Sequence, residues 1–580
     1  MDKKEVARIL SETAAMLELA GENRFKVIAY ENGARAVLGF PGDLTEAVAS
    51  RELLHVPGIG AGLFAAIESL LATGKFDLHE ELSAAYPPSL RECLRVPGFG
   101  ARKAKLLYEK LGVDSIEALE RACRDGSLAQ LKGFGTKTAE RILKGIGVVR
   151  ASAGYHPYPR ARARAEQVVA QLRQTGLTRS IEIAGSVRRR KEVIRDIDLV
   201  ATSQDPAALS ETFRNQFGVA EVIGSGETKT SVRLADGLAA DLRIVSDQEF
   251  GAALQYFTGS ERHNTQLRGR AKRLGFKLNE YGLFRSESEE SVAAADEEGI
   301  YRQLGLAYIE PEMREGTGEI EAAERGELPR LIEEKDLRGL IHIHTNESDG
   351  RASLEEMLAG VDQAGYEYAA ITDHSQTAAY AGGLTPERVL AQRAQIRALA
   401  PRFPRLRIFH GTEADILPDG SIDFGDEFLE GFDVVVASVH SRFGLPRDEQ
   451  TQRLIRAVRN PRVSILGHPS GRLLLSRDPV DADLEAVVAA AAEAGCAIEI
   501  NCNPERLDLD WRLCRQAVDA GALLSIDPDA HSVAELGLVP YGVGIARKGW
   551  VTREATLNAK GTKDFIAWLE NRRGKPLIRT

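Results

Sequence analysis

The spacing of apolar and polar residues changes character along the 580-residue chain. Residues 1–145 have the pattern of helices joined by short glycine turns. Residues 181–284 mix strand patterns such as DIDLVAT and ADLRIV with helical ones. From residue 340 onward, seven short and continuously apolar runs alternate with helical stretches. Such runs are typical of a parallel sheet covered by helices, so we expect several domains, the last of them barrel-like.

A short repeat occurs three times in the first helical region. LLHVPGIGAGLFAAI (53–67), LRVPGFGARKAKLL (94–107) and LKGFGTKTAERIL (131–143) each have an apolar lead, a G-x-G turn and the start of a helix. Glycine permits the tight turn, and the N–H groups at a helix start suit a phosphate without any basic side chain. The alternative is three ordinary helix–turn–helix packings, but the shared register favours phosphate-binding hairpins.

Composition and charge narrow the classes of function. No apolar run reaches the roughly 18 residues of a membrane span, and the charged N-terminus MDKKEVARIL is unlike a signal peptide. The five cysteines are scattered without a C-x-x-C pair, which predicts a cytoplasmic protein with neither a disulfide frame nor a cysteine zinc site. Because the net charge is −10, a nucleic acid would have to be held by local basic groups. Nothing demands a dimer, and we expect a monomer.

Histidines and acids mark the ends of the seven apolar runs. In IHIHTNESDG (341–350), the two histidines are two residues apart, and residues at that spacing in a strand face the same side. The carboxyl ends of parallel barrel strands converge on one face, so ligands from all the runs should meet. The expected ligands are His342, His344, Asp349, His374, Glu413, His440, His468, Asp529 and His531. Nine nitrogen and oxygen ligands without a thiolate suit two or three ions, whereas a structural role better explains a single histidine.

The same segments resemble a known family. HIHTNESDG, ITDHS, HGTEADI, SVH, LGHPSGR and DPDAH together look like the polymerase-and-histidinol-phosphatase (PHP) family of metal-dependent phosphoesterases. The resemblance implies a distorted seven-stranded (β/α)7 barrel that holds up to three Mn²⁺ or Zn²⁺ ions on those nine residues and hydrolyses phosphoesters. Leu340 and Ile341 stand where the family usually has Asp-Leu, but that Asp is not among the ligands.

A second acidic pair lies in IEIAGSVRRRKEVIRDIDLVATS (181–203). Asp196 and Asp198 are again two apart on a predicted strand, and two carboxylates on one face are costly without a cation between them. Oxygen ligands favour magnesium, and Asp241 in ADLRIV offers a third. The neighbouring turn and its arginines would suit phosphate, so the pattern indicates nucleotidyl transfer by two metals. The alternative from these residues alone is a solvated acidic strand beside a basic loop.

A longer motif favours a nucleotidyl-transfer site over a solvated acidic strand. YFTGSERHNTQLRGRAKRLGFKLNEYGLF (256–284), taken with GSVRR, DIDLV and ADLRIV, resembles the family X DNA polymerases, the group of DNA polymerase beta. That resemblance covers residues 1 to about 310, and the PHP resemblance covers about 338 to 545. The order is similar to that of the bacterial family X polymerases with two parts.

The family's roles carry over by motif position. Asp196 and Asp198 would bind two Mg²⁺ ions, and Asp241 would bind the catalytic ion and help to deprotonate the primer 3′-hydroxyl. Ser186 and Arg189 would hold the phosphates of the incoming nucleotide, and Tyr256 and Phe257 would restrict a 2′-hydroxyl on its sugar. The full set of residues implied to contact the nucleotide is Gly185, Ser186, Arg189, Tyr256, Phe257, Gly259 and Asn264. The residues implied to contact DNA are Gly58, Gly60, Gly98, Gly100, Lys26 and Arg268, and Asn264 would also reach the minor groove.

Three departures from the polymerase pattern matter. Arg195 stands where the family usually has glycine before the first catalytic Asp, which would either replace or crowd a close phosphate contact. The Schiff-base lysine of DNA polymerase beta falls at Ala66, which cannot form an imine, so we expect no lyase by that mechanism. Lys26 could still grip a 5′-phosphate. The acidic stretch at 310–330 has the pattern of a linker or an extended wrap, and the resemblance gives it no functional role.

The sequence thus predicts a chain of several domains: a helix-hairpin-helix region, an α+β nucleotidyltransferase palm with a thumb, and a barrel. The expected limits are 1–90 and 91–150 (helical), 151–250 (palm), 251–315 (thumb), 316–337 (linker) and 338–580 (barrel). We expect a repair polymerase that fills short gaps in primed or gapped DNA with dNTPs, and a 3′→5′ exonuclease or 3′-end phosphoesterase in the barrel. The alternatives are a DNA-end scaffold with weak polymerase activity and a phosphatase acting on a small metabolite.

Overall fold

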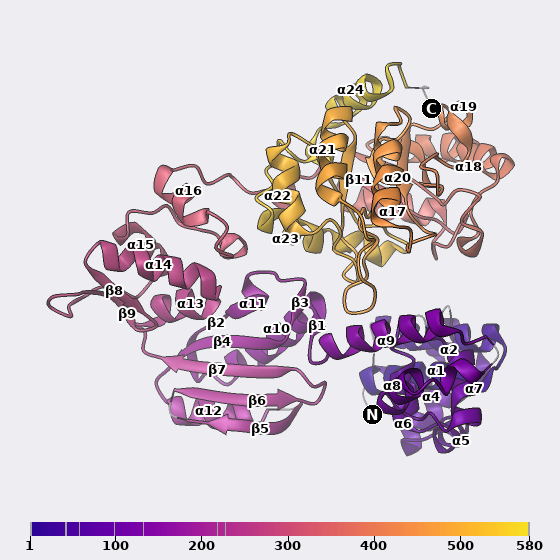
Figure 1. Cartoon of the computed structure of the whole chain (residues 1–580). Helices are drawn as coiled ribbons and strands as arrows, with labels where there is room; N and C mark the ends of the chain where they lie inside the picture. The colour runs from indigo at the N-terminus through magenta and orange to yellow at the C-terminus, as the bar shows by residue number, and fades with distance from the viewer. Residues whose placement is uncertain are drawn as a thin grey trace. The chain divides into compact units, whose positions relative to one another are not determined.

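The computed structural model describes residues 3–40, 43–56, 58–97, 99–131, 133–216, 218–226 and 228–577. These residues form two compact units, Met1–Ala153 with Leu475–Arg477, and Gly154–Leu474 with Asp478–Thr580. Figure 1 shows the helices and strands of both units.

The first unit is helical, and its described residues form two larger apolar cores and one smaller one. Its helices are α1 (Lys3–Ala20), α2 (Arg24–Gly39), α3 (Leu44–Ala49), α4 (Ala61–Thr73), α5 (Asp77–Ala85), α6 (Pro88–Cys93), α7 (Ala101–Leu111), α8 (Ile116–Arg124) and α9 (Thr136–Ala151). One larger core contains Leu10, Val37 and Ile67 from α1, α2 and α4. The other larger core contains Leu107 and Ile142 from α7 and α9. Each of these two cores therefore joins helices on both sides of a predicted G-x-G turn.

The three G-x-G turns share one backbone geometry. The second glycine of each turn is the N-cap of the following helix, with φ and ψ of −84° and 172° at Gly60, −82° and 168° at Gly100, and −84° and 173° at Gly135. A glycine N-cap has no side chain that could accept from the first-turn N–H groups, so these groups are left for another acceptor. The predicted common register of the repeat is therefore present in the structure.

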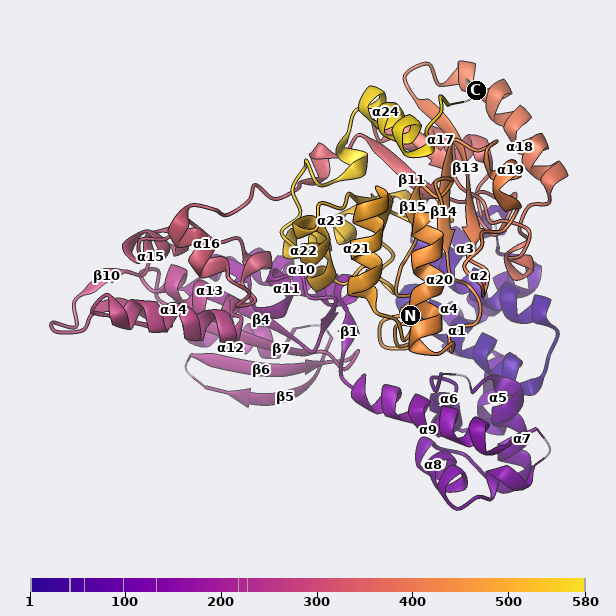
Figure 2. The same ribbon diagram turned by 45° about the horizontal axis from the view of Figure 1, so that its top comes forward.

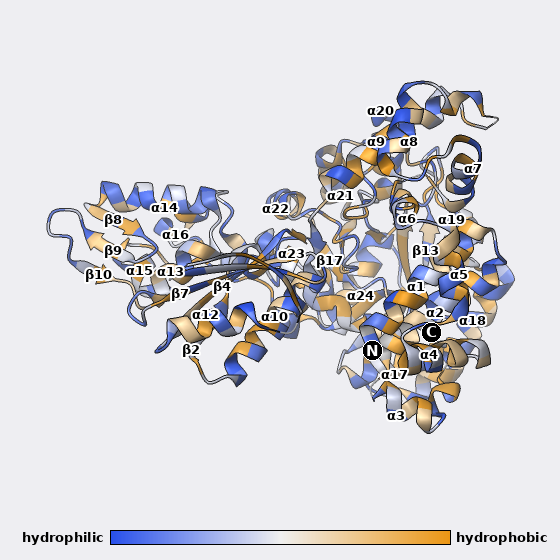
Figure 3. Cartoon of the chain, turned by 90° about the horizontal axis from the view of Figure 1, so that it is seen from below, coloured by the Kyte–Doolittle hydropathy of each residue, from blue (hydrophilic) through white to orange (hydrophobic). Residues whose placement is uncertain are grey.

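A five-stranded mixed sheet begins the second unit. Its order is β2-β4-β7-β6-β5, with β4 parallel to β7 and the other pairs antiparallel. The strands are β2 (Thr178–Ile183), β4 (Asp196–Ser203), β5 (Val219–Ser225), β6 (Lys229–Leu234) and β7 (Ala239–Val245). Helices α10 (Tyr158–Gln174) and α12 (Pro206–Arg214) add apolar residues to the core on one face of the sheet. Helix α12 carries both hydrophobic and hydrophilic residues (Figure 3).

Alternation along β4 and β7 separates this core from polar residues. Ile197 and Leu199 of β4, together with Leu242 of β7, lie in the core with α10. Because neighbouring residues of a strand point to opposite faces, the acidic residues between them face away from that core. The other face carries Val200, which packs with α13 (Phe250–Thr258).

A smaller helical region follows the sheet. It consists of α13, α14 (Glu261–Arg273), β8 (Phe276–Asn279), β9 (Gly282–Arg285), β10 (Ser291–Ala293), α15 (Glu297–Gln303), the 3₁₀ turn η3 (Pro311–Met313) and α16 (Glu319–Arg325). The stretch expected to be a linker or an extended wrap is a packed part of this region. Ile320 lies in its core, and the Glu319 carboxylate is buried against His263 Nδ1 at 2.8 Å. We call residues 310–330 the acidic segment; its buried acids are accommodated because cationic or polar groups surround them.

The remaining residues form the barrel predicted from the seven apolar runs. All seven strands are parallel and follow chain order, β11-β12-β13-β14-β15-β16-β17. A bridge between Ile343 and Ala530 joins the last strand's end to the first and nearly closes the barrel. The strands are β11 (Gly339–Ile343), β12 (Tyr368–Ile371), β13 (Arg407–Asp415), β14 (Val434–Ser438), β15 (Ile465–Leu466), β16 (Ala497–Asn501) and β17 (Leu524–Asp527).

Helices surround the barrel strands in both views (Figure 1, Figure 2). The larger ones are α17 (Leu354–Gln363), α18 (Pro386–Leu399), α20 (Arg447–Arg459), α21 (Leu484–Ala494), α22 (Trp511–Asp519), α23 (Val539–Lys548) and α24 (Thr562–Arg573). One apolar core lies between strands and helices, and a second, with Ile341, Phe409 and Val436, fills the interior. Phe565 of α24 joins the interior core, so that end of the barrel is plugged. The site must therefore lie at the other end.

Candidate functional site

The barrel brings all nine predicted ligands together. They fall into four overlapping groups whose ligand atoms lie within 4.8 Å of one another. The groups are His344, Asp349, His374 and His531; His342, Glu413 and His468; His342, His344 and Asp529; and His374, Glu413 and His440. The groups share members, so the arrangement is one continuous cluster and not four separate sites.

Two carboxylates occupy the centre of this cluster. Asp529 Oδ1 lies 3.4 Å from His342 Nε2 and 3.3 Å from His344 Nε2. Glu413 is 1% exposed, and its oxygens lie 3.4 Å from His342 Nε2 and 3.5 Å from His344 Nε2. Both imidazoles therefore point at carboxylate oxygens, but at distances longer than those of ordinary hydrogen bonds.

The polar atoms of the cluster fit a cation. Nε2 of His342 and Nε2 of His344 are buried and have no hydrogen-bond partner among the described residues. A buried nitrogen without a partner is costly, and a bound cation would satisfy it together with the carboxylates beside it. Burial and the charges of His531 and His374 lower the pKa of His344 to about 3. Despite burial, nearby carboxylates raise the pKa of His440 to about 10 and that of His531 to about 9. A bound cation would have to displace the protons of the latter two.

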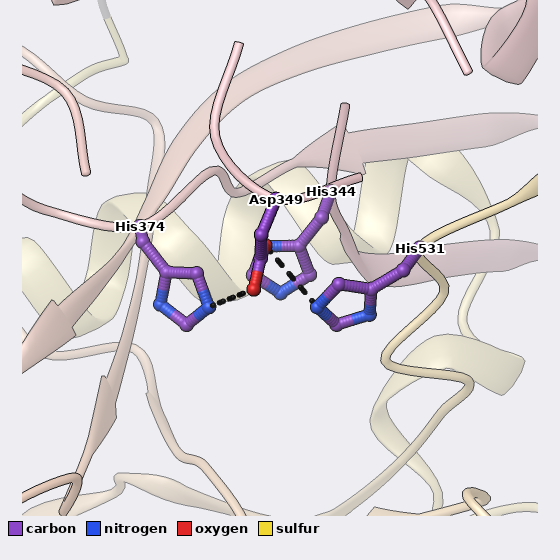
Figure 4. Close-up of side chains that lie close together, drawn as sticks. All are labelled: His344, Asp349, His374 and His531. Carbon is purple, nitrogen blue, oxygen red and sulfur yellow. Dashed lines mark ion pairs between the residues drawn. The ribbon is translucent and has the colours of Figure 1, made fainter. Parts of the chain in front are cut away.

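Figure 4 shows the outer group of the cluster, in which Asp349 lies between two histidines. Its oxygens lie 3.6 Å from His374 Nε2 and 3.3 Å from His531 Nε2. Burial raises the pKa of Asp349, but a hydrogen bond from His531 and the charges of His344 and His374 bring it down to about 2. At 34% side-chain exposure, Asp349 is the most accessible carboxylate of the set and marks the open side of the cluster.

Backbone geometry turns the first two histidines inward. Ile341 belongs to the interior core, whereas Ile343 belongs to the outer core, and His342 between them has a φ of 61°. A regular strand would place Ile341 and Ile343 on one face; the positive φ and the register shift at this point reverse the alternation. His468 and Asp529 also have positive φ, at 23° and 51°. Such conformations in non-glycine residues gather at functional sites.

Several polar residues outside the predicted set hold the ligands in place. His342 Nδ1 is hydrogen-bonded to Glu499, and His440 Nδ1 lies 2.8 Å from Asp415 Oδ1. Asn501 donates to Glu499 at 3.1 Å and to Asp529 at 3.0 Å. Carboxylates behind ligating imidazoles fix their orientation. For Glu499 and Asn501, the alternation in AIEIN is a sequence signal, because it places both residues on one face of the strand. No sequence pattern points to Asp415.

The palm carries the second acidic group. Asp198 and Asp241 are register partners on the parallel strands β4 and β7, and Asp196 lies two residues earlier on the same face of β4. Burial and the charges of Asp196 and Asp241 raise the pKa of Asp198 to about 7. Lys229 Nζ lies 2.6 Å from Asp241. Carboxylates that repel one another in this way fit divalent cations with oxygen ligands.

A hollow of about 340 Å³ lies beside these carboxylates. Its lining includes Asp196, Asp198, Arg268 and every residue that the sequence placed near a nucleotide: Gly185, Ser186, Arg189, Tyr256, Phe257, Gly259 and Asn264. Gly185 has a φ of 60°, and a Cβ there would lie 2.0 Å from Asp198 Oδ2. The Ser186 hydroxyl oxygen is buried and has no partner among the described residues. The turn is thus built for close backbone approach and offers one unused hydroxyl.

Other residues of the hollow are already engaged. Asn264 Nδ2 donates to the Tyr256 carbonyl at 2.7 Å, and Gln255 donates to Asn264 Oδ1 at 2.9 Å. Tyr256 and Phe257 pack edge to face with their ring centroids 5.2 Å apart. These contacts fix the aromatic pair in the wall of the hollow. Arg195 is exposed and is not part of the lining, so its side chain does not crowd the pocket.

The first unit places the hairpin residues at its surface. Gly58, with a φ of 93°, and Gly60 line a shallow hollow together with the exposed ring of Phe25. A Cβ on Gly60 or Gly100 would meet no atom within 4 Å. Gly98 lies outside the described residues. Lys26 pairs with Glu22 at 3.4 Å, and Ala66 is 6% exposed in the core.

Comparison with known families matches three segments. Residues 1–76 match a helix-hairpin-helix domain, residues 90–147 match a SAM-like helix-hairpin-helix tandem, and residues 253–315 match the DNA polymerase beta thumb. Among the described residues, no helix combines the length and the apolar character needed to cross a membrane.

Comparison with individual proteins extends over nearly the whole chain. The chain is 36% identical to the DNA polymerase/3′-5′ exonuclease PolX of Bacillus subtilis (strain 168), over 98% of this chain and 100% of that protein. It is 29% identical to a probable phosphatase of Shewanella sediminis (strain HAW-EB3), over 41% of this chain and 95% of that protein. A probable phosphatase of Shewanella sp. (strain ANA-3) is 30% identical over 34% of this chain and 77% of its own length.

Fold, site and comparisons define a class of enzyme, a beta-like DNA polymerase joined to a (β/α)7 metallophosphoesterase barrel. Its architecture is the predicted one, with helix-hairpin-helix domains, a polymerase region with a thumb, and a seven-stranded barrel. The chain belongs to the bacterial family X DNA polymerases that carry a C-terminal PHP domain.

Proposed function

We propose that the chain is a DNA-directed DNA polymerase that fills short gaps during repair and removes or processes 3′ ends by a 3′→5′ exonuclease in its barrel. The observation that carries the polymerase assignment is the pairing of Asp198 with Asp241 beside the hollow that Ser186 and Arg189 line. The nine-residue cluster at the open end of the barrel carries the exonuclease.

The palm residues divide the work of nucleotidyl transfer. Asp196, Asp198 and Asp241 would hold two Mg²⁺ ions, which would neutralise charge on the transferring phosphoryl group and favour loss of the primer 3′-hydroxyl proton. Ser186 would donate its free hydroxyl to a phosphate oxygen, and Arg189 would supply positive charge. Because the hydrogen bonds of Asn264 fix the aromatic wall, Tyr256 and Phe257 are held where a ribose 2′-hydroxyl would have to fit.

The barrel residues divide the work of hydrolysis. The nine-residue cluster would hold up to three Mn²⁺ or Zn²⁺ ions, which would lower the pKa of water and neutralise charge on phosphorus. Glu499 and Asp415 orient the imidazoles of His342 and His440. Arg506, whose Nε lies 3.8 Å from Asp529 Oδ2, supplies a side-chain cation beside the cluster for the substrate phosphate.

DNA is the common substrate of both sites. The uncapped helix starts at Gly60 and Gly100 offer N–H groups to backbone phosphates. Binding of this kind does not require a positive net charge on the chain. Gly58, Lys26 and Arg268 would add contacts to the duplex. We place the protein in the cytoplasm as a monomer that uses primed or gapped DNA and dNTPs.

Two observations weigh on the alternatives. A DNA-end scaffold with a weak polymerase would follow if Arg195 blocked the nucleotide, but its side chain is exposed and outside the hollow. A phosphatase for small metabolites would have no use for three hairpins of one geometry. Both observations favour the polymerase with an exonuclease.

A duplex with a one-nucleotide gap and a 5′-labelled primer tests the proposal. Asp241→Asn is expected to reduce incorporation by about 100-fold or more while primer shortening continues. Asp349→Asn is expected to abolish shortening in Mn²⁺ while incorporation in Mg²⁺ continues. Asp564→Asn, an exposed position on α24, serves as the matched control and should change neither. Shortening that survives Asp349→Asn and also His344→Ala would show that the cluster is not the nuclease.

A further inference from the structure

Arg189, the arginine assigned to the nucleotide phosphates, is held by groups outside the palm. Its Nε donates to Glu315 Oε1 at 3.1 Å, and its Nη1 donates to the Thr258 carbonyl. The residue is 9% exposed, so these contacts lie in a largely water-excluded place. Glu315 belongs to the acidic segment, for which the polymerase pattern suggested no role. A carboxylate on this arginine would by itself oppose the binding of a triphosphate.

A lysine of the barrel shares that carboxylate. Lys548, the last residue of α23, donates from Nζ to Glu315 and, at 3.2 Å, to the Arg189 carbonyl. It is 1% exposed, and its Nζ also lies 5.1 Å from the ring centre of Trp511. A lysine buried to this degree needs a counter-charge, and Glu315 supplies it. Lys548, Glu315 and Arg189 are therefore one cluster with two cations and one anion.

The net charge of these three residues determines how strongly the cluster attracts a phosphate in the hollow. With Lys548 present, the formal charges of the three residues sum to +1, and the Glu315 carboxylate is divided between two cations. Without Lys548 the sum is zero, and the carboxylate would act on Arg189 alone. Because charges interact strongly where water is excluded, the loss of one buried cation reaches the nucleotide side of the arginine.

The neighbouring contacts of α23 allow this effect to be separated from simple docking of the barrel. Arg547, one residue earlier, donates to Glu312 Oε1 at 2.8 Å and lies 3.7 Å from Glu310. Arg190 Nε lies 3.4 Å from the same Glu312 oxygen. Arg547 thus fastens the barrel to the acidic segment without touching Arg189 or Glu315, which makes it a matched control for Lys548.

We propose that Lys548 of the barrel is a positioning residue for the polymerase site, sharing the carboxylate of Glu315 so that Arg189 keeps its positive charge and its place for the nucleotide phosphates. The proposal rests on the assignment of Arg189 to the nucleotide. It gives the acidic segment a role, since Glu315 links a helix of the exonuclease barrel to the arginine of the polymerase.

The test measures KM for dNTP and kcat on a duplex with a one-nucleotide gap, with the full-length chain. Lys548→Met should raise KM for dNTP about tenfold with little change in kcat. Lys548→Arg should stay near the original KM because it keeps the charge. Arg547→Met should leave KM unchanged. Lys548→Met combined with Glu315→Gln restores the sum of +1 and should recover most of the lost affinity.

Three outcomes overturn the proposal: an unchanged KM in Lys548→Met, an equal rise in Arg547→Met, or a double variant as poor as the single one. Shortening of single-stranded DNA in Mn²⁺ reports that the barrel is intact. If Lys548→Met does not fold, Glu315→Gln alone decides, because charge sharing predicts a lower KM and a purely structural role a higher one. Arg189→Gln separates the two claims. If it leaves KM unchanged, the assignment of Arg189 to the nucleotide is wrong. If KM rises in Arg189→Gln but not in Lys548→Met, only the role proposed for Lys548 is wrong.

Discussion

Asp198 and Asp241 lie side by side at one register position of the parallel strands β4 and β7. The pairing matters because it places two carboxylates from segments more than forty residues apart on one face, opposite the apolar core that anchors both strands. A cation bound by this pair would therefore be held by the sheet itself and not by a mobile loop.

Gly185→Ala should abolish incorporation. The added Cβ would lie 2.0 Å from Asp198 Oδ2, and the backbone there has a φ of 60°, which alanine adopts only with strain. We expect a loss of about 100-fold or more in gap filling, while primer shortening by the barrel is kept. Gap filling at the original rate would mean that the turn does not have this geometry during catalysis.

Glu499→Gln should weaken the exonuclease without removing any ligand. Its carboxylate accepts from His342 Nδ1, and replacing such an outer partner typically costs about 10- to 100-fold in metal affinity or activity. The measurement is primer shortening over a range of Mn²⁺ concentrations, with incorporation in Mg²⁺ as the internal control. If shortening is unaffected at low Mn²⁺, the orientation of His342 does not limit the site.

Glu297 should contribute to acid stability. Burial raises the pKa of Glu297, but the charges of Arg314 and Arg188 bring it below its usual value of 4.5. A depressed folded-state pKa stabilises the fold fully above the unfolded pKa, and this contribution is lost as the pH falls through the folded one. Glu297→Gln should therefore lose about 3 kcal/mol at pH 7, because it leaves the fully buried Arg314 unpaired.

The same variant should lose less additional stability on acidification. Thermal unfolding at pH 7 and at pH 4 or below would show a smaller difference for Glu297→Gln than for the original chain. Glu290→Gln, at an exposed position of the same region, is the control and should follow the original curve. Parallel curves for Glu297→Gln and the original chain would contradict the assigned shift.

The first hairpin should bind DNA without forming an imine. Ala66 is buried and has no amine, so borohydride should trap no adduct with a 5′-deoxyribose phosphate through this position. Gly60→Ala should fold normally, since a Cβ there meets no atom within 4 Å, yet weaken binding to gapped DNA by hindering the phosphate's approach. Gly147→Ala on α9, which has the same free space, is the control for binding.

Much of the fold could be predicted from local pattern. The seven apolar runs were visible because parallel strands buried on both faces need continuous apolar sequence, and the hairpins were visible because their turns need glycine at fixed positions. The family resemblance then supplied roles for residues such as Arg189 that spacing alone could not.

Other features depend on contacts between distant segments. The reversed alternation at His342 depends on a φ of 61°, which cannot be predicted from the residue type. The role of Asp415 can be recognised only from its contact with His440 in the folded chain. The acidic segment suggested a solvated linker because its partners, among them His263 and Lys548, are remote in sequence. Charge patterns cannot distinguish a solvated run from one whose counter-ions come from another domain.

The acidic segment has a consequence for how this chain can be divided or rearranged. Glu310, Glu312 and Glu315 receive cations from α23, so a polymerase cut free before the barrel would keep the carboxylates and lose Arg547 and Lys548. The Glu315 carboxylate would then act on Arg189 alone, next to a pocket that must accept a triphosphate. The two enzymes therefore cannot be exchanged as independent cassettes between relatives unless the ion pairs at their boundary are exchanged with them.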